Sequence, residues 1–298
     1  MKAPLIFSLF NQHPFINKLQ QHYNAELGKV TLRNFPDGES YFRIESDVRN
    51  RDIIIVESLA HPSEKVLPLL FSCETLHELG AKRVGLIAPY LAYMRQDKRF
   101  HAGEGVTSNY FAKLLSHYVD WLVTVDPHLH RHHSLDEIYS IPSSVVHAAA
   151  PIAKWIKSNI AKPVLIGPDS ESEQWVSDIA KRADVPFMIL QKTRYGDREV
   201  EISAPEIENY HEHTPVLIDD IISTAQTMLE TLIHLLRLQL KPTICIGVHA
   251  IFAGDAYEKL QQAHVDKIVT CNTILHESNG IELDQEVLVG VEHLVFGS

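Results

Sequence analysis

Short apolar runs alternate with amphipathic stretches from one end of the chain to the other. The clearest runs have the length of buried strands, and they are Ile53–Val56, Val84–Ala88, Leu122–Val125, Val164–Ile166, Phe187–Leu190, Val216–Ile218, Ile244–Val248 and Ile268–Val269. Between them, Glu64–Leu79 and Ser223–Leu238 carry the periodicity of amphipathic helices. This alternation predicts an α/β fold built from βαβ units around mainly parallel sheets.

The apolar runs fall into two blocks, and the segment Ser-Ile-Pro-Ser-Ser at residues 140–144 is the predicted joint between them. A chain of 298 residues has room for two domains of about 150 residues each. We therefore expect one domain over residues 1–143 and a second over residues 144–298. No long linker separates the blocks, and their repeated order leaves open that both are duplicates of one α/β unit.

The composition of the chain excludes several classes of partner and location. The chain has 27 Lys and Arg against 38 Asp and Glu, a net charge of −11, which argues against general electrostatic binding to nucleic acid or an anionic membrane. Any phosphate site must therefore be local. No apolar run approaches the roughly 20 residues that cross a bilayer, and residues 1–14 lack the long apolar stretch of a secretion signal. We expect a cytoplasmic protein with Cys73, Cys245 and Cys271 as buried thiols.

The strongest candidate site lies in the segment Val216–Thr227, where an apolar strand runs into two acids and a hydroxyl-rich turn. The acids are Asp219 and Asp220, and the hydroxyls belong to Ser223, Thr224 and Thr227. A helix that begins near Thr224 places its N-terminus at the carboxyl end of the strand, where an anion is favoured. The two acids would suit sugar hydroxyls. Taken alone, the segment fits an ordinary helix N-terminus with solvated acids equally well.

Other polar clusters each fit a solvated surface feature when read alone. Arg95-Gln-Asp-Lys98 offers two cations, an amide and an acid after a strand, and Phe35-Pro-Asp-Gly-Glu39 joins a turn sequence to an aromatic and two acids. Asp126-Pro-His128 and Gly167-Pro-Asp169 end two apolar strands, where an imidazole and a carboxylate can hold a hard cation. Lys192-Thr-Arg194 places two cations at the root of a polar stretch.

The run His128-Leu-His-Arg-His-His133 has a second interpretation as a zinc site. No cysteine and no second ligand pair lies near it, and a chain with 18 histidines clusters some of them by chance.

These segments, in this order, resemble the ribose-phosphate pyrophosphokinase (PRPP synthetase) family over almost the whole chain. Asp219–Thr227 is similar to the loop that binds 5-phosphoribosyl diphosphate (PRPP) in type I phosphoribosyltransferases. Ser58-Leu59 with Pro62, and Gly80-Ala-Lys-Arg83, belong to the same pattern. The resemblance implies an α/β fold of two tandem phosphoribosyltransferase-like domains, each with a mainly parallel sheet flanked by helices.

The resemblance also implies roles for individual residues. It assigns ATP binding to Arg95, Gln96 and Asp97, with Phe35, Asp37 and Glu39 contributed by a neighbouring subunit. It assigns ribose 5-phosphate binding to Asp219, Asp220, Ser223, Thr224, Ala225, Gln226 and Thr227. His128 and Asp169 are the implied Mg²⁺ ligands, and Lys192 and Arg194 are the implied catalytic cations.

The implied activity is transfer of the diphosphoryl group of ATP to O1 of D-ribose 5-phosphate, giving PRPP and AMP in a homo-oligomer. The alternatives are a catalytically silent, synthetase-like regulatory subunit and a phosphoribosyltransferase that consumes PRPP. The last has no reason to keep Arg95–Lys98 or the Phe35–Glu39 turn. The first is motivated by three departures: Ala225-Gln226 and Glu171-Ser172 stand where the family carries glycines, and Arg131 where it carries Gln.

Overall fold

The computed structural model describes residues 2–195, 199–203, 207–263 and 265–295, without the side chains of residues 191–208 and 293. The chain divides into two compact units, Met1–Val146 with Asp284–Ser298, and His147–Leu283. Each unit is a parallel sheet flanked by helices, which confirms the predicted α/β fold with two sheet domains. Among the described residues, no helix combines the length and the apolar composition that a membrane span requires.

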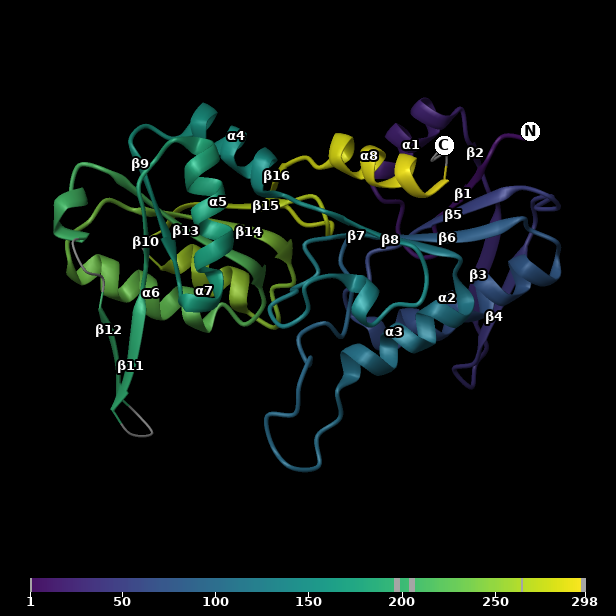
Figure 1. Cartoon of the computed structure of the whole chain (residues 1–298), viewed down its shortest axis with the longest axis horizontal. Helices are drawn as coiled ribbons and strands as arrows, with labels where there is room; N and C mark the ends of the chain where they lie inside the picture. The colour runs from purple at the N-terminus through teal and green to yellow at the C-terminus, as the bar shows by residue number, and fades with distance from the viewer. Residues whose placement is uncertain (1, 196–198, 204–206, 264, 296–298) are drawn as a thin grey trace. The chain divides into compact units, whose positions relative to one another are not determined.

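The first unit contains a parallel sheet in the order β2-β1-β5-β6-β7-β8 (Figure 1). Its strands are β1 (Leu5–Phe7), β2 (Glu26–Leu27), β5 (Asp52–Val56), β6 (Arg83–Ala88), β7 (Trp121–Val125) and β8 (Ser143–Val146). The antiparallel hairpin consists of β3 (Val30–Asn34) and β4 (Ser40–Ile44). Helices α1 (Phe15–Tyr23) and α8 (Asp284–Val295) cover one face, and α2 (Pro62–Glu78) and α3 (Thr107–Tyr118) the other. A short 3-10 helix, η1, spans Leu135–Glu137.

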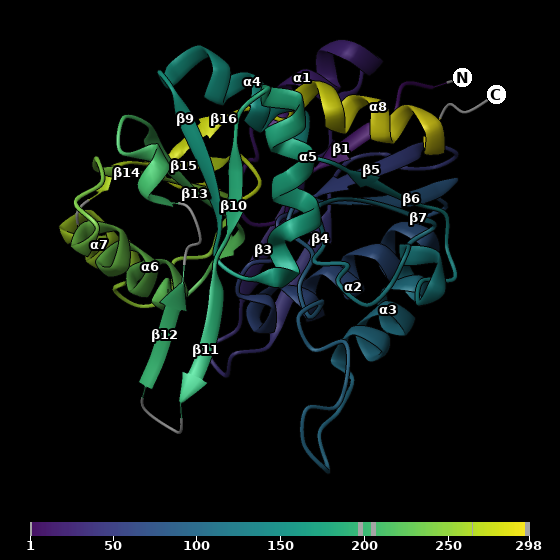
Figure 2. The same ribbon diagram turned by 60° about the vertical axis from the view of Figure 1, so that its left-hand side comes forward.

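The second unit contains a parallel sheet in the order β10-β9-β13-β14-β15-β16. Its strands are β9 (Pro163–Gly167), β10 (Phe187–Ile189), β13 (Thr214–Ile222), β14 (Thr243–Ala250), β15 (Val265–Cys271) and β16 (Asn279–Ile281). The antiparallel hairpin consists of β11 (Gln191–Tyr195) and β12 (Glu199–Ser203). Helices α4 (Ala149–Asn159) and α5 (Glu173–Ala183) cover one face, and α6 (Gln226–Arg237) and α7 (Ala256–Gln262) the other (Figure 2). Short 3-10 helices span Ser170–Ser172 (η2) and Ile207–Tyr210 (η3).

The two units share one topology. In each sheet the first strand lies between the second and the third, and an antiparallel hairpin is inserted between the second and the third. The helix that follows each sixth strand is exchanged: α4 follows β8 but packs on α5 and β16, and α8 follows β16 but packs on α1 and β8. This correspondence supports an origin by duplication of one α/β unit.

The observed division of the chain differs from the predicted one in where the C-terminal helix belongs. The boundary expected between residues 143 and 144 falls inside β8, and α8, expected in the second domain, belongs to the first unit. The reason is its apolar face, because Val287, Leu288 and Val291 are buried. Gly290 allows the close approach, since a Cβ there would lie 2.9 Å from Val146 Cγ2.

Every apolar run identified as a strand overlaps a strand of the structure, and the central strands β7 and β14 are buried along their whole length. Helices on both faces of a parallel sheet explain why these strands are continuously apolar. Each unit contains a cluster of buried apolar side chains. Cys73, Cys245 and Cys271 are free and buried, as expected.

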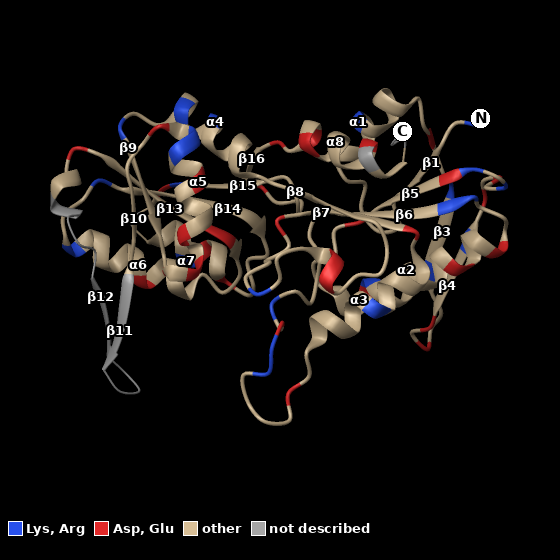
Figure 3. Cartoon of the chain, in the orientation of Figure 1, with Lys and Arg blue, Asp and Glu red and all other residues tan. Residues whose placement is uncertain are grey.

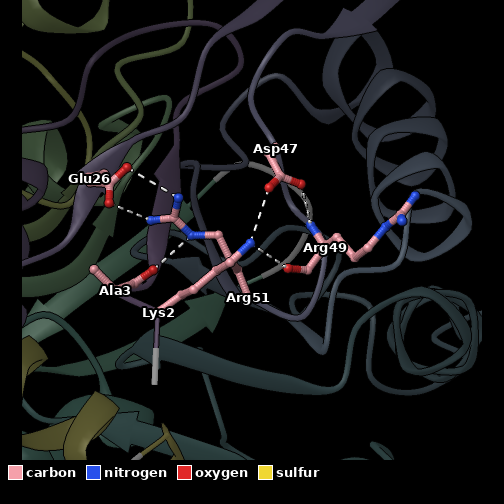
Figure 4. A network of polar contacts seen from close by, with 6 residues as sticks. All are labelled: Lys2, Ala3, Glu26, Asp47, Arg49 and Arg51. Carbon is pink, nitrogen blue, oxygen red and sulfur yellow. Dashed lines mark hydrogen bonds and ion pairs between the residues drawn. The ribbon is translucent and has the colours of Figure 1, made fainter.

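A polar network fastens the N-terminal edge of the first sheet (Figure 4). Arg51, just before β5, donates from Nε to the Ala3 carbonyl at 2.8 Å and from Nη1 to Glu26 of the edge strand β2 at 3.1 Å. Lys2 donates to Asp47 at 3.1 Å. These contacts join β1 and β2 to the start of β5.

Candidate active site

The chemistry-bearing segment of the second unit lies where its strand order reverses. From β9 the chain proceeds to β10 on one side, whereas β13 pairs with β9 on the other side and continues to β14. The crevice at the carboxyl ends of two such strands is the usual ligand site of an open α/β sheet. Asp169 follows β9, and Asp219 and Asp220 lie near the end of β13. The structure thus brings three of the predicted site residues together.

These three carboxyl groups interact strongly. Burial, followed by the charges of Asp220 and Asp169, raises the pKa of Asp219 well above the usual range of an aspartate. The backbone N–H of Asp220 donates to Asp219 Oδ1 at 3.0 Å, which opposes that rise. A cation among the three groups would favour their ionised forms. Since Mg²⁺ binds through one or two carboxylates and retains waters, this set of oxygens fits it.

Asp169 also shapes its own loop. Its Oδ1 accepts from the backbone N–H groups of Glu171 at 3.1 Å and Ser172 at 3.2 Å, so it caps η2. The Ser172 hydroxyl donates back to the Asp169 carbonyl at 2.6 Å. The departure at Glu171-Ser172 is therefore a capped 3-10 turn. Glu171 is exposed and Ser172 is buried.

The hydroxyl-rich turn leads into α6, as the sequence predicts, but the helix begins at Gln226 rather than near Thr224. Ala225 precedes it in the left-handed region, with φ 57° and ψ 8°. Its carbonyl accepts the first helical bond, from Leu229 N–H at 2.8 Å. The first N–H groups of a helix lack partners within the helix, so the turn offers donors and a favourable dipole to an anion. Ser223, Thr224 and Thr227 lie on this turn and the first helical residues.

A buried histidine beside this site was missed by sequence reasoning. His249, near the end of β14, pairs in register with Ile221 of β13. Its Nδ1 lies 2.9 Å from the Thr273 hydroxyl, which donates to the Val248 carbonyl at 2.8 Å. With 18 histidines in the chain, sequence alone offers no signal that singles out this one.

The ATP motif of the first unit forms a loop between β6 and α3. Arg95 is exposed, whereas Gln96 is anchored to the start of α3. The Gln96 carbonyl accepts from Ser108 N–H at 3.3 Å, and its Oε1 accepts from the Thr107 hydroxyl at 3.2 Å. Asp97 points to Arg131, whose Nη1 lies 2.9 Å from both carboxylate oxygens. Sequence reasoning identified Arg131 only as a departure from the family pattern.

The predicted adenine-binding turn is the exposed tip of the β3–β4 hairpin. Gly38 takes φ 92°, and Phe35 N–H donates to the Glu39 carbonyl at 2.7 Å. Asp37 Oδ1 accepts from Glu39 N–H at 3.1 Å. Phe35 is 39% exposed, and the centre of its ring lies 4.8 Å from the guanidinium carbon of Arg33. An exposed aromatic with two acids at a hairpin tip suits contact with a base outside the unit.

The loop after β7 has an unusual backbone. Asp126 and His128 have φ values of 31° and 57°, a region that non-glycine residues seldom adopt and that is often found at functional sites. His128 Nδ1 lies 3.1 Å from His130 Nε2. The first unit therefore presents the predicted metal-binding imidazole on a sharply turned loop at a strand's carboxyl end.

The predicted catalytic cations lie on the second unit's hairpin. Lys192 and Arg194 belong to strand β11, which pairs with β12 through Lys192 opposite Ile202 and Arg194 opposite Val200. Their side chains lie outside the described part of the structure.

Comparisons with known proteins identify the family. Residues 4–118 match the N-terminal domain of ribose phosphate pyrophosphokinase, and residues 134–286 match the phosphoribosyl transferase domain. The chain is 35% identical to ribose-phosphate pyrophosphokinase of Saccharolobus solfataricus, over 86% of this chain and 88% of that protein. The corresponding protein of Bacillus cereus is 27% identical, over 95% of this chain and 90% of its own length.

The fold agrees with these relationships. A crystal structure of phosphoribosylpyrophosphate synthetase from Mycobacterium smegmatis covers 99% of this chain and 100% of its own, with a TM-score of 0.84 and 21% identity. Because both halves match in their expected order and relatives match over most of their length, the chain belongs to the ribose-phosphate pyrophosphokinase family.

Proposed function

We propose that this chain transfers the β,γ-diphosphoryl group of ATP to O1 of D-ribose 5-phosphate, giving PRPP and AMP. The observation that carries the proposal is the presence of both family domains in one chain. A phosphoribosyltransferase that consumes PRPP would account for the second domain but not for the first.

In this proposal, ribose 5-phosphate binds at the reversal point of the second sheet. The hydroxyls of Ser223, Thr224 and Thr227 and the start of α6 hold the 5-phosphate, with Ala225 and Gln226 supplying backbone to the turn. Asp219 and Asp220 accept from the ribose hydroxyls. The positive end of the helix dipole attracts the phosphate, and carboxylates accept hydrogen bonds from the sugar hydroxyls, so both interactions are favourable.

ATP binds to the first unit, where Arg95 contacts the nucleotide and Gln96 is held by the N-terminus of α3. The Phe35–Glu39 tip reaches the adenine site of a neighbouring copy, with Phe35 stacking on the base and Asp37 and Glu39 accepting from its amino group. The exposure of this tip supports that reach.

The reaction forms a bond between O1 of the sugar and the β-phosphorus of ATP and breaks the bond from that phosphorus to the α,β-bridging oxygen, which leaves on AMP. The O1 proton passes to solvent. Asp169 and His128 would hold Mg²⁺, which neutralises phosphate charge when bound. Lys192 and Arg194 stabilise charge on the transferred group, and no covalent intermediate with the protein is needed.

The direct test is incubation of the purified chain with ATP, ribose 5-phosphate and Mg²⁺, followed by separation of the nucleotides and PRPP. We expect AMP and PRPP in equal amounts, and no AMP when ribose 5-phosphate is omitted. ATP binding without product would instead favour the silent regulatory subunit. Release of pyrophosphate from PRPP and a free base would favour a phosphoribosyltransferase.

The shared site has its own test. We expect Phe35→Ala and Lys192→Ala variants to be weakly active separately and to recover activity when mixed under conditions that exchange subunits. A mixture that shows only the sum of the two separate activities would contradict a site built from two copies.

A further inference from the structure

Asp97 and Arg131 join two loops of the first unit. Strands β6 and β7 are parallel neighbours, so the loops that leave them emerge at the same edge of the sheet. The first loop carries Asp97 and the second carries Arg131. Two contacts of 2.9 Å connect Arg131 Nη1 to the two carboxylate oxygens of Asp97.

The burial of this ion pair is asymmetric. The Asp97 side chain is 1% exposed, whereas that of Arg131 is 32% exposed. A buried carboxylate is costly without a charged partner, and a pair of this kind fixes the geometry of both groups. Asp97 is therefore turned into the protein and holds the guanidinium, which reaches the surface.

Arg131 shares an aromatic neighbour, Phe100, with Lys98 of the ATP motif. Its guanidinium carbon lies 5.8 Å from the centre of the Phe100 ring, and Lys98 Nζ lies 5.0 Å from the same centre. Arg95 and Arg99 are exposed on the same loop, and Figure 3 shows blue segments along the chain that leads to α3. Neighbouring cations repel one another, and a polyanion among them removes that repulsion. In a chain of net charge −11, such a local group of cations indicates a specific anion.

We propose that Arg131 binds the polyphosphate of the nucleotide and that Asp97 is the residue that positions it. The inference rests on the proposed function, because it adds to the ATP site a residue that binds phosphate. It changes the role of Asp97 from a direct ATP ligand to a positioning residue. It also explains why Arg131 stands where the family carries Gln, because Arg has a positive charge and a rigid planar set of N–H donors, and Gln has neither.

The test compares nucleotides that differ only in their phosphates. Binding of AMP and of α,β-methylene-ATP, which cannot undergo the transfer, is measured by titration calorimetry for the full chain. We expect Arg131→Gln to raise the Kd of the ATP analogue about tenfold, as loss of one charged hydrogen-bonding group does, and that of AMP less than twofold. Arg131→Lys, which keeps the charge but not the fork, should fall between.

Asp97→Asn should show the same preference for weakening the ATP analogue. The double variant Asp97→Asn/Arg131→Gln should bind it no more weakly than Arg131→Gln alone, because Asp97 acts through Arg131. The matched control is Arg182→Gln, which breaks a 2.9 Å ion pair with Asp178 on the exposed side of α5 and should change neither Kd.

Other outcomes overturn the inference. Equal losses for AMP and the ATP analogue would mean that the pair only supports the loop, and no loss would mean that Arg131 does not contact phosphate. If Arg131→Gln fails to fold by circular dichroism, Arg131→Lys provides the same comparison. Failure of the unmodified chain to bind either nucleotide would overturn the proposed function together with this inference. Equal or absent losses of affinity in the variants, with normal binding by the unmodified chain, would overturn this inference alone.

Discussion

Ala225 combines a left-handed backbone with a buried side chain. Its φ is 57° and the residue is 6% exposed. The left-handed conformation costs an L-residue roughly 1–2 kcal/mol, and this cost is offset in part by burial of the methyl group, about 0.8 kcal/mol. The next residue, Gln226, is the first residue of α6 and is exposed. The two positions where the family carries glycine therefore differ physically.

The first prediction separates these positions. Ala225→Gly should leave the free energy of unfolding unchanged or raise it by up to about 1 kcal/mol. It should also lower KM for ribose 5-phosphate, since no Cβ then stands at the phosphate turn, with KM for ATP unchanged. Gln226→Gly should lower the free energy of unfolding by about 0.5–1 kcal/mol. Urea titrations and initial rates measure both. A higher KM for ribose 5-phosphate in a folded Ala225→Gly variant would contradict this account.

The second prediction concerns Lys192. An interaction made mainly in the transition state affects turnover more than substrate binding, so Lys192→Ala should lower kcat by about 100-fold or more with a smaller change in either KM. Steady-state rates give the comparison, and Lys181→Ala, at an exposed position of α5, is the control. Unchanged turnover in Lys192→Ala would remove this residue from the reaction.

At this scale the sequence predicts residue types but not long-range pairs. The sequence marks Ala225 only as a departure from the family's glycine, and the structure shows that its φ is positive. The contact between Asp97 and Arg131 spans 34 residues and exists because β6 and β7 are neighbours. The local sequence does not show which strands are neighbours in the sheet. From the sequence, Asp97 cannot be distinguished from the other polar residues of its charged loop.

At the scale of helices and strands, the burial of an element determines whether the sequence pattern reveals it. Strands covered on both faces appear as apolar runs, and all the runs identified in the sequence overlap strands of the structure. Among the edge strands, β10 is predicted from its apolar run, whereas the short β2 (Glu26–Leu27) and the partly polar β8, whose sequence is Ser-Ser-Val-Val, are missed. The sequence pattern instead places the joint between the domains in part of β8. The α6 helix starts later than expected because the backbone at Ala225 is left-handed.

The third prediction follows from the acids at the ends of β9 and β13. The pKa of Asp219 is raised in the folded protein by burial and by Asp220 and Asp169, so the native state holds more protons than the unfolded chain. Stability without a divalent cation should therefore fall as pH rises through a window that begins near the ordinary value of about 3.9. At neutral pH, Asp219→Asn should be more stable than the unmodified chain, because the amide carries no charge that burial and the neighbouring acids disfavour.

Urea unfolding at several pH values, with EDTA or with Mg²⁺, checks this. Mg²⁺ should stabilise the unmodified chain more than it stabilises Asp219→Asn, because the cation relieves the repulsion at Asp219 that this substitution removes. The control is Asp266→Asn at an exposed position of β15. The same pH dependence in Asp219→Asn and the unmodified chain would show that Asp219 does not titrate as described.

For the whole molecule, the shared topology of the two units places different side chains at corresponding strand ends. In both sheets the third strand leads through a left-handed residue into a helix, at His61 before α2 and at Ala225 before α6. The acid pair is kept only in the second unit, where Asp219 and Asp220 stand near the end of β13. The corresponding strand of the first unit leads to Glu57, whose carboxylate is buried against Lys65 at 3.1 Å. The same framework thus presents in one unit the two acids that we propose to bind the sugar, and in the other a closed ion pair.

The fourth prediction concerns the exchanged helix α8. Val287, Leu288 and Val291 are buried by packing of α8 within the first unit. Removing three such side chains from the core forfeits roughly 5–9 kcal/mol, a loss similar to the whole stability of a domain, about 5–15 kcal/mol. Residues 1–146 alone should therefore lack a cooperative urea transition. Joining them to residues 284–298 through a flexible Gly/Ser linker should restore it, and Val291→Asp in that linked protein should abolish it again. A cooperative transition in residues 1–146 alone would mean that the first sheet is stable with one face uncovered, and that α8 is an addition to the unit and not part of its core.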